Sequence, residues 1–331
     1  MSLGAAERWI ARFAGRRVVV LGDLMADEFI HGDIARISRE APVLILQHRR
    51  TVTVPGGGGN AVANLRALGA QPIPVGLMGK DAAGEALAQQ FRAAGVPTDS
   101  LLSPAGWETP TKSRVLAGGV HTRRQQVVRV DRGALPGALS QELQTSLAER
   151  LRAALGVAEA LVVADYGYGA ATPEILAAAA AGFPGPVLVD SRNQVAAYRG
   201  VLACTPNQEE VERALGRDLP DEAAVLAAGA ELLRRTGNRA ALVTRGALGM
   251  VLFQGGEAPL VLPAHGSDEV ADVTGAGDTV VATFALAVAA GAPLEDAARL
   301  ANVAAGLVVM KAGTATVSPQ ELRRALQEVP A

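Results

Sequence analysis

The sequence predicts an α/β fold in which a mostly parallel sheet carries helices on both faces, with a small β-sheet lid beside it. Short apolar runs rich in β-branched residues recur along the chain, and segments with helical spacing separate them. Two further segments alternate polar and apolar residues without a helical period. No repeat or low-complexity linker divides the chain, so we expect residues 1–331 to form one domain.

Six apolar runs predict the strands of the parallel sheet. The first, RRVVVLGD, is a continuous β-branched run, which is typical of a strand buried on both faces. The others are QPIPVGLMG, ALVVADYG, GPVLVDS, GVLACTPN and AALVTRG. Helical patterns lie between them, such as AGEALAQQFRAAG and DEAAVLAAGAELLRRTG, and the second ends at a predicted helix stop, Gly237. Strands that alternate with helices favour a parallel sheet with helices on both sides.

The lid is predicted from two insertions, at about residues 27–55 and 108–132. Both are expected to form strands outside the parallel sheet, and AGGVHT, residues 117–122, has the composition of a hairpin turn. An exposed lid has unpaired strand edges, which the lid of a second copy would cover. We therefore expect a homodimer.

Composition excludes several classes of function. The net charge is −2 without a basic block and only 3% of residues are aromatic, which argues against nucleic acid as a partner. The single cysteine, Cys204, rules out an internal disulfide framework and fits a reducing compartment. Glu7 and Arg8 interrupt any apolar run near the start, so we expect no signal sequence there. The longest apolar stretch, residues 280–293, is too short to span a bilayer as a helix. We expect a soluble cytoplasmic protein without a membrane partner.

The segment DVTGAGDT predicts an anion site next to a carboxylate. Small residues let backbone N–H groups approach an anion, and a helix that starts near Ala276 directs its positive end there. Asp278, in the first turn, could then take a proton from an attacking hydroxyl group. The alternative is a simple turn in which Gly275 and Gly277 supply flexibility and Asp278 favours the helix dipole.

Two further segments suit phosphate chemistry. Four glycines precede Asn60 and an apolar helix in PGGGGNAVANLRALGA, which exposes backbone amides at a helix N-terminus or, alternatively, forms a hinge between lid and body. In TPNQEE, Asn207 and Glu210 lie three residues apart on one face and suit a hydrated Mg²⁺ beside phosphates. The alternative for this pair is a capping box.

Together, and in this order, GD after the first strand, GGGGNAVANLRALGA, TPNQEE and DVTGAGDT resemble the ribokinase-like (PfkB) family of carbohydrate kinases over nearly the entire chain. The resemblance implies a three-layer α/β/α body with a β lid, ATP as phosphoryl donor and Mg²⁺ as helper. It implies that Asp278 is the base and that the amides of Gly275, Ala276 and Gly277 form the anion hole. Asn207 and Glu210 would hold the Mg²⁺-phosphate region. Sugar hydroxyls would contact Asp23, Gly57, Gly58 and Asn60.

The family pattern also implies an adenosine site and a cation site. The adenosine site falls on Thr244, Arg245, Gly246, Gly249 and Asn302, although Asn302 could be only a polar residue on a buried helix. Asp272 matches a position that helps to hold a monovalent cation such as K⁺ in several relatives.

One branch of the family is more similar than the others. The segments ARISREAPVLIL, RRQQVVRVD, VVADYGYGA and KAGTATVSP resemble the D-glycero-β-D-manno-heptose 7-phosphate kinases of lipopolysaccharide precursor synthesis, which phosphorylate the anomeric hydroxyl group. Such a substrate requires cations away from the ATP. The candidates are Lys112, Arg114, Arg124, Arg129 and Arg192, each of which could instead lie on a solvated face of the lid.

The chain departs from this branch at two positions. Tyr168 and Arg192 stand where the branch usually has lysines, so a charge is absent at Tyr168. The resemblance implies that the later adenylyl transfer needs a separate nucleotidyltransferase. The remaining alternatives are a kinase for another sugar, sugar phosphate or nucleoside, and a non-catalytic sugar- or nucleotide-binding regulator. A dinucleotide-dependent dehydrogenase fits least, because the turn after the first strand lacks the required glycines.

Overall fold

The computed structural model describes residues 1–118, 125–135, 137–266 and 271–328. Its body is a sheet in the order β13-β12-β11-β10-β9-β8-β1-β4-β5. The six predicted strands are present as β1 (Arg17–Gly22), β4 (Gln71–Leu77), β8 (Ala160–Asp165), β9 (Val187–Ser191), β10 (Ala203–Cys204) and β11 (Ala240–Thr244), all paired in parallel. The sequence analysis did not predict β5 (Leu101–Leu102), β12 (Met250–Gln254) and β13 (Leu260–Leu262), of which the last two are antiparallel.

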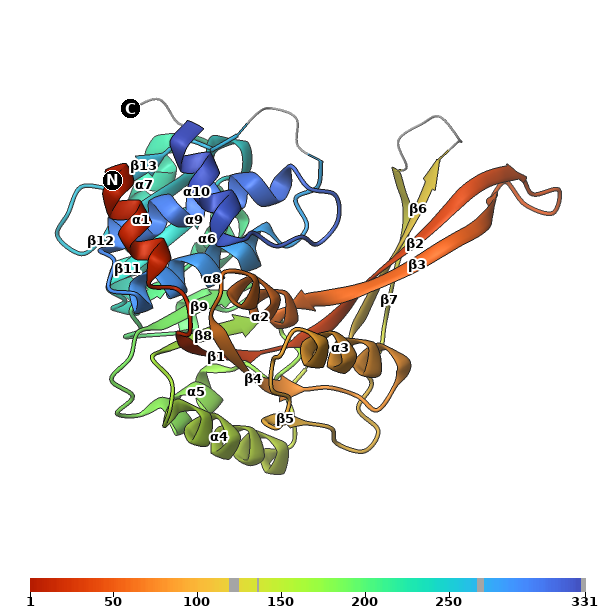
Figure 1. Ribbon diagram of the computed structural model, residues 1–331, viewed down its shortest axis with the longest axis horizontal. Helices are drawn as coiled ribbons and strands as arrows, with labels where there is room; N and C mark the ends of the chain where they lie inside the picture. Colours follow the sequence, from red (N-terminus) through yellow and green to blue (C-terminus); the bar gives the residue numbers. More distant parts are fainter. Residues whose placement is uncertain (119–124, 136, 267–270, 329–331) are drawn as a thin grey trace.

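Helices cover both faces of this sheet, which confirms the predicted three-layer α/β/α architecture (Figure 1). In β1, Val18 and Val20 belong to one apolar cluster and Val19 and Leu21 to another, because successive side chains point to opposite faces. The first cluster contains residues of α1 (Leu3–Ala11), α2 (Gly58–Ala67), α8 (Ala276–Ala289), α9 (Leu294–Val309) and α10 (Pro319–Glu328). The opposite face packs against α4 (Gln141–Leu155), α5 (Pro173–Ala180), α6 (Gln208–Leu215) and α7 (Glu222–Thr236).

The remaining elements are short or peripheral. Helix α3 (Ala82–Ala93) packs near the base of the lid, and the 3₁₀ turns are η1 (Val195–Ala197) and η2 (Gly246–Leu248). Helix α7 ends as predicted, since Gly237 adopts a left-handed conformation with φ of 66° directly after Thr236. No helix in the described ranges combines the length and apolar character needed to cross a membrane.

The lid is a separate sheet in the order β3-β2-β6-β7 that projects from the body (Figure 1). Its strands are β2 (Leu24–Ile37), β3 (Leu44–Gly57), β6 (Thr111–Gly118) and β7 (Gln125–Arg132). The two hairpins β2/β3 and β6/β7 are antiparallel, whereas β2 and β6 pair in parallel. Part of the predicted AGGVHT turn, residues 119–122, lies outside the described residues.

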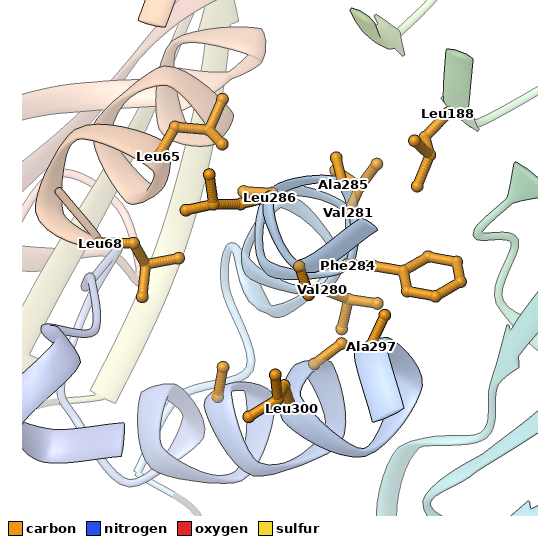
Figure 2. Close-up of a cluster of buried hydrophobic side chains, with 14 of the residues drawn as sticks. Leu65, Leu68, Leu188, Val280, Val281, Phe284, Ala285, Leu286, Ala297 and Leu300 are labelled. Carbon is orange, nitrogen blue, oxygen red and sulfur yellow. The ribbon is translucent and has the colours of Figure 1, made fainter. Parts of the chain in front are cut away.

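Helix α8 lies at the centre of the larger apolar cluster (Figure 2). Leu286 faces Leu65 of α2 and Leu68 directly after that helix, and Val280 faces α9. Phe284 and Val281 lie on the side of Leu188 of β9. These side chains are at most 1% exposed. A helix enclosed on all sides cannot rotate without disrupting its neighbours, so its first turn is held in a fixed position.

Candidate active site

Asp278 is a buried carboxylate in the first turn of α8, at the helix end that carries the positive dipole. The residue is 3% exposed, and each carboxylate oxygen accepts a hydrogen bond. Oδ1 accepts from the Tyr166 hydroxyl at 2.6 Å and Oδ2 accepts from Asn60 Nδ2 at 2.9 Å. Burial raises the pKa of Asp278 to about 7, and these two donors limit the rise. The predicted base is thus poised near neutral pH.

A polar network joins the start of α8 to α2. Asn60 Oδ1 accepts from Asn64 Nδ2 at 3.0 Å, and Asn64 Oδ1 accepts from Thr279 Oγ1 at 3.0 Å. Gly275 precedes the helix with φ of 81°, and a Cβ atom there would lie 2.4 Å from Asn60 Nδ2. Glycine is therefore required at this position for two independent reasons.

One amide of the predicted anion hole already has a backbone partner. The amide of Ala276 donates to the Val273 carbonyl oxygen at 3.3 Å, which is a long bond. An anion at this helix N-terminus would compete with that contact. Gly277 faces the neighbouring strand, and a Cβ atom on it would lie 3.9 Å from Asp190 Oδ2.

Asp23, predicted to bind sugar hydroxyls, organises the loop that follows β8. Its carboxylate accepts hydrogen bonds from the backbone amides of Tyr166, Tyr168 and Ala170 at 2.8, 3.0 and 2.9 Å. The side chain is buried, and this burial raises its pKa to about 6 against the effect of the three donors. A sugar hydroxyl group could therefore donate only to the lone pairs of the Asp23 carboxylate that these three amides leave free.

Glu210 and Asp190 form a pair of neighbouring carboxylates beside Asp278. Asn207 and Glu210 make the capping box at the start of α6, with reciprocal bonds of 2.8 Å. Burial raises the pKa of Glu210 and of Asp190, and the charge of Glu210 raises that of Asp190 further. A cation would relieve this repulsion. No cluster of three or more acidic, histidine or cysteine ligands occurs in the described part of the chain, so phosphates and water would complete the shell of any metal ion here.

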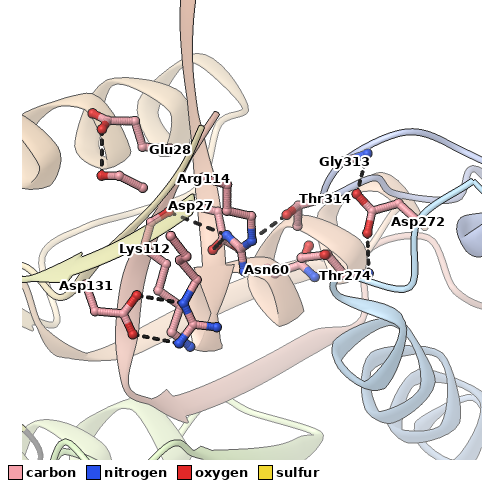
Figure 3. Close-up of polar contacts among 12 residues, drawn as sticks. Asp27, Glu28, Asn60, Lys112, Arg114, Asp131, Asp272, Thr274, Gly313 and Thr314 are labelled. Carbon is pink, nitrogen blue, oxygen red and sulfur yellow. Dashed lines mark hydrogen bonds and ion pairs between the residues drawn. The ribbon is translucent and has the colours of Figure 1, made fainter. Parts of the chain in front are cut away.

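Basic residues gather where the lid meets the body (Figure 3). Lys112 is 8% exposed, and its pKa is lowered by burial and by the charges of Arg192, Arg129 and Arg114. Two of these cations have a carboxylate partner, because Arg114 pairs with Asp27 and Arg129 with Asp131. Burial and the charges of Asp131 and Asp23 raise the pKa of Tyr168, whereas Arg192 and Arg129 oppose the rise. Arg124 lies outside the described residues.

The remaining predicted residues surround this centre at various depths. Gly57 and Gly58 lie where β3 joins α2. The backbone amide of Thr244 donates to the Pro206 carbonyl oxygen at 2.9 Å, which brings the two predicted nucleotide segments together.

Arg245, also predicted to contact the nucleotide, pairs with Glu222, and its buried Nε atom has no partner. Gly246 and Gly249 bound η2, while Asn302 donates to the Pro263 carbonyl oxygen at 2.7 Å. Asp272 accepts from the amides of Thr274 and Gly313 at 2.9 and 3.1 Å.

The sequence analysis assigned no role to Tyr166 and Asp190. Tyr166 directly follows β8 and Asp190 is the last residue but one of β9, so both lie at the ends of runs that the sequence predicts as strands. The particular side chains depended on loop geometry, and nothing in the local sequence distinguished Tyr166 from Tyr168.

Known proteins resemble this chain in sequence and in fold. The model of the pfkB family of carbohydrate kinases matches residues 16–321. The chain is 46% identical over 321 residues to Bifunctional protein HldE of Alkalilimnicola ehrlichii, and 42% identical over 322 residues to Bifunctional protein HldE of Pseudomonas aeruginosa. These matches cover 96% of this chain and 64% and 65% of the relatives, so the chain spans less than two thirds of their length.

Solved structures show the same fold at lower identity. Arabidopsis thaliana ribokinase, in complex with ribose and ATP, aligns with a TM-score of 0.72 and 23% identity, over 96% of this chain and all of that one. Phosphofructokinase-2 from Escherichia coli, in complex with potassium, aligns with a TM-score of 0.74 and 20% identity, over 95% and 98% of the two chains. The architecture and the match over residues 16–321 lead to one conclusion: the chain belongs to the pfkB family of carbohydrate kinases, which are phosphotransferases with an alcohol group as acceptor.

Proposed function

We propose that the protein transfers the γ-phosphoryl group of ATP to the anomeric hydroxyl group of a phosphorylated sugar, D-glycero-β-D-manno-heptose 7-phosphate. The observation that carries the kinase assignment is the buried carboxylate of Asp278 at the N-terminus of α8, with its pKa raised to about 7. A base poised near the working pH can accept the proton of an attacking hydroxyl group. The amides at the start of α8 would stabilise negative charge on the transferred group.

The residues present fit a divalent cation beside the phosphates of ATP. Asp190 and Glu210 offer hard oxygen ligands whose repulsion a cation would relieve, and Mg²⁺ is commonly bound through one or two carboxylates together with substrate phosphates. When bound, the ion would neutralise charge on the phosphoryl groups. Burial raises the pKa of Glu210, and the charges of Arg213 and Arg192 oppose this rise.

The acceptor is inferred from the charge of four basic residues where the lid meets the body, here called the lid cations. They are Lys112, Arg114 and Arg129 of the lid and Arg192, which follows β9 of the body. Burial lowers the pKa of Lys112, and the positive charges of Arg192, Arg129 and Arg114 lower it further. A phosphate group on the substrate would relieve the repulsion between these positive charges, whereas a simple sugar would not. The resemblance of segments such as ARISREAPVLIL and VVADYGYGA to heptose 7-phosphate kinases supports a heptose phosphate as the acceptor.

A substrate panel tests the acceptor. Release of ADP is measured with heptose 7-phosphate, fructose phosphates and ribose at equal concentrations. We expect heptose 7-phosphate to give the highest kcat/KM, and ribose to be a poor acceptor. A higher kcat/KM for ribose than for every phosphorylated sugar would contradict the proposal that the lid cations bind a substrate phosphate.

The role of Glu210 in metal binding gives a second test. Glu210→Gln keeps an acceptor for the capping bond from the Asn207 amide but removes the charge. We expect the Mg²⁺ concentration at half-maximal rate to rise roughly 10- to 100-fold, as for other supporting metal contacts. The control is Glu209→Gln, an exposed neighbour in the same helical turn, which should leave the Mg²⁺ titration unchanged. If the two variants gave the same Mg²⁺ titration, Glu210 would not be a ligand of the metal ion.

The other sequence predictions remain predictions. A monovalent cation is expected near the carboxylate of Asp272, which accepts hydrogen bonds from the amides of Thr274 and Gly313. The nucleotide is expected along Thr244 to Gly249 and Asn302. A homodimer is consistent with the exposed valines of β7, namely Val127, Val128 and Val130. The cytoplasmic location is consistent with the absence of a membrane-spanning helix from the described ranges.

A further inference from the structure

The side chain of Tyr166 is held from three directions beside the catalytic carboxylate. Its backbone amide donates to Asp23 Oδ2 at 2.8 Å, which fixes the loop after β8. Its ring lies under the lid, with Lys112 Nζ 5.4 Å from the ring centroid. Its hydroxyl group donates to Asp278 Oδ1 at 2.6 Å, the short distance that is typical of an O–H donor to an ionised carboxylate.

We propose that Tyr166 is a positioning residue for the base: its hydroxyl group fixes the orientation of the Asp278 carboxylate and stabilises the ionised form that accepts the proton. This inference rests on the proposed function, in which Asp278 is the base. Neither the sequence pattern nor the comparisons assign this task to Tyr166.

The hydrogen-bonding capacity of Asp278 allows this role. A carboxylate has about four lone-pair sites, and Tyr166 and Asn60 occupy one on each oxygen. The remaining sites can receive the proton of the acceptor hydroxyl group. Because each oxygen is held by a donor on a different element, the carboxylate cannot rotate freely about its Cβ–Cγ bond, and its free lone pairs keep one direction.

The charges around Asp278 explain why a donor is needed. Asp190 of β9 and Asp27 of β2 face it with negative charge, and both raise its pKa in addition to burial. The neutral donors that oppose this effect are Asn60 of α2 and Tyr166. Burial raises the pKa of Tyr166, and the negative charges of Asp278, Asp190 and Glu210 raise it further, so the tyrosine keeps its proton and remains a donor.

Removal of the Tyr166 hydroxyl group should change the pKa of Asp278 in a direction that the hydrogen bond itself determines. The hydrogen bond lowers the pKa of Asp278, so Tyr166→Phe should raise that pKa further. The base must be ionised, and activity is therefore lost as pH falls through this pKa. We expect the acidic limb of the kcat/KM profile to move up by about one pH unit, with a roughly tenfold loss at pH 6 and a smaller loss at pH 9.

The matched control is Tyr198→Phe. Tyr198 is also buried and also donates to a carboxylate, Asp165 Oδ2, at 3.1 Å, but it does not contact Asp278. We expect this variant to keep the acidic limb of the wild-type chain. Thermal unfolding of both variants shows whether either has lost stability.

Two further measurements separate positioning from a structural role. In the Asp278→Asn background, Tyr166→Phe should add less than about twofold, because residues that act as a unit are not additive. Site-specific 3,5-difluorotyrosine at position 166 is a stronger donor of nearly the same shape, and it should move the acidic limb downward. This second variant keeps the test decisive if Tyr166→Phe folds poorly.

Several outcomes would overturn the inference. The inference is wrong if the acidic limb of the kcat/KM profile moves neither in Tyr166→Phe nor with 3,5-difluorotyrosine at position 166. It is also wrong if Tyr166→Phe lowers activity equally at every pH, or if its effect adds fully to that of Asp278→Asn. If Asp278→Asn itself retains activity, the proposed base is wrong. If Asp278→Asn is inactive while both Tyr166 variants keep the wild-type limb, only the role of Tyr166 fails.

Discussion

Asp278→Asn should lower kcat by roughly 10²- to 10⁴-fold, the range typical of a lost general base. The change is nearly isosteric, but the amide cannot accept a proton, and its Nδ2 would face the donor of either Tyr166 or Asn60. The measurement is acceptor-dependent release of ADP at pH 8, where the wild-type carboxylate is mostly ionised given its pKa of about 7. The KM for ATP should change little, because the acceptor-facing carboxylate is not expected to bind the nucleotide.

Asp221→Asn is the control for this change. Asp221 is an exposed N-cap residue of α7, where asparagine is an equally good cap. We expect its activity to stay within about twofold of wild type, since surface changes of this kind are typically small. An Asp278→Asn enzyme that stays within tenfold of wild type would exclude Asp278 as the base.

Arg192→Met should lower kcat/KM for the phosphorylated acceptor by roughly 10- to 100-fold, while kcat/KM for ribose changes less than about twofold. The estimate follows from the loss of a charged hydrogen bond to phosphate, and methionine keeps much of the apolar stem. The same substitution relieves repulsion on Lys112, so the pKa of that amine should rise toward its ordinary value. The comparison of two acceptors with one variant distinguishes phosphate recognition from a general loss of catalysis.

The matched control is Arg239→Met. Arg239 is exposed and precedes β11, whereas Arg192 follows the end of the parallel strand β9, so the two arginines lie at opposite edges of the sheet. Both variants remove one positive charge, so a long-range effect of net charge would appear in both. Equal losses on the two acceptors with Arg192→Met would argue against a phosphate subsite at the lid.

The sequence predicted the body of the fold well because the decisive signals are local. Apolar runs long enough for one strand, and helical spacing between them, define β1, β4 and α7 without knowledge of distant contacts. The antiparallel strands β12 and β13 were missed. Their segments, MVLFQ and LVL, flank a turn with two glycines and follow directly on β11, where the alternation of strand and helix stops.

For the candidate site, the sequence predicted individual residues but not the contacts between them. Asp278, Asn60 and Glu210 were recognised from their motifs, but the bond from Asn60 to Asp278 joins positions 218 residues apart. No local pattern gives such a contact. Likewise, the capping and metal-binding interpretations of Asn207 and Glu210 were opposed in the sequence, whereas the observed capping bonds leave Glu210 next to Asp190. The cap and a metal contact are therefore compatible in one side chain.

The junction between lid and body has a mechanical consequence. Strand β1 ends at Gly22 and β2 begins at Leu24, while β3 ends at Gly57 and α2 begins at Gly58. A Cβ atom on Gly58 would lie 3.0 Å from the Cα atom of Gly22, so the outgoing and returning chains of the first hairpin touch at this point. The base of the hairpin therefore lies directly beside the first turn of α2, the turn that carries Asn60 to the carboxylate of Asp278. We expect a displacement of the hairpin to be felt at this turn, because the contact between Gly22 and Gly58 leaves no space between the two segments.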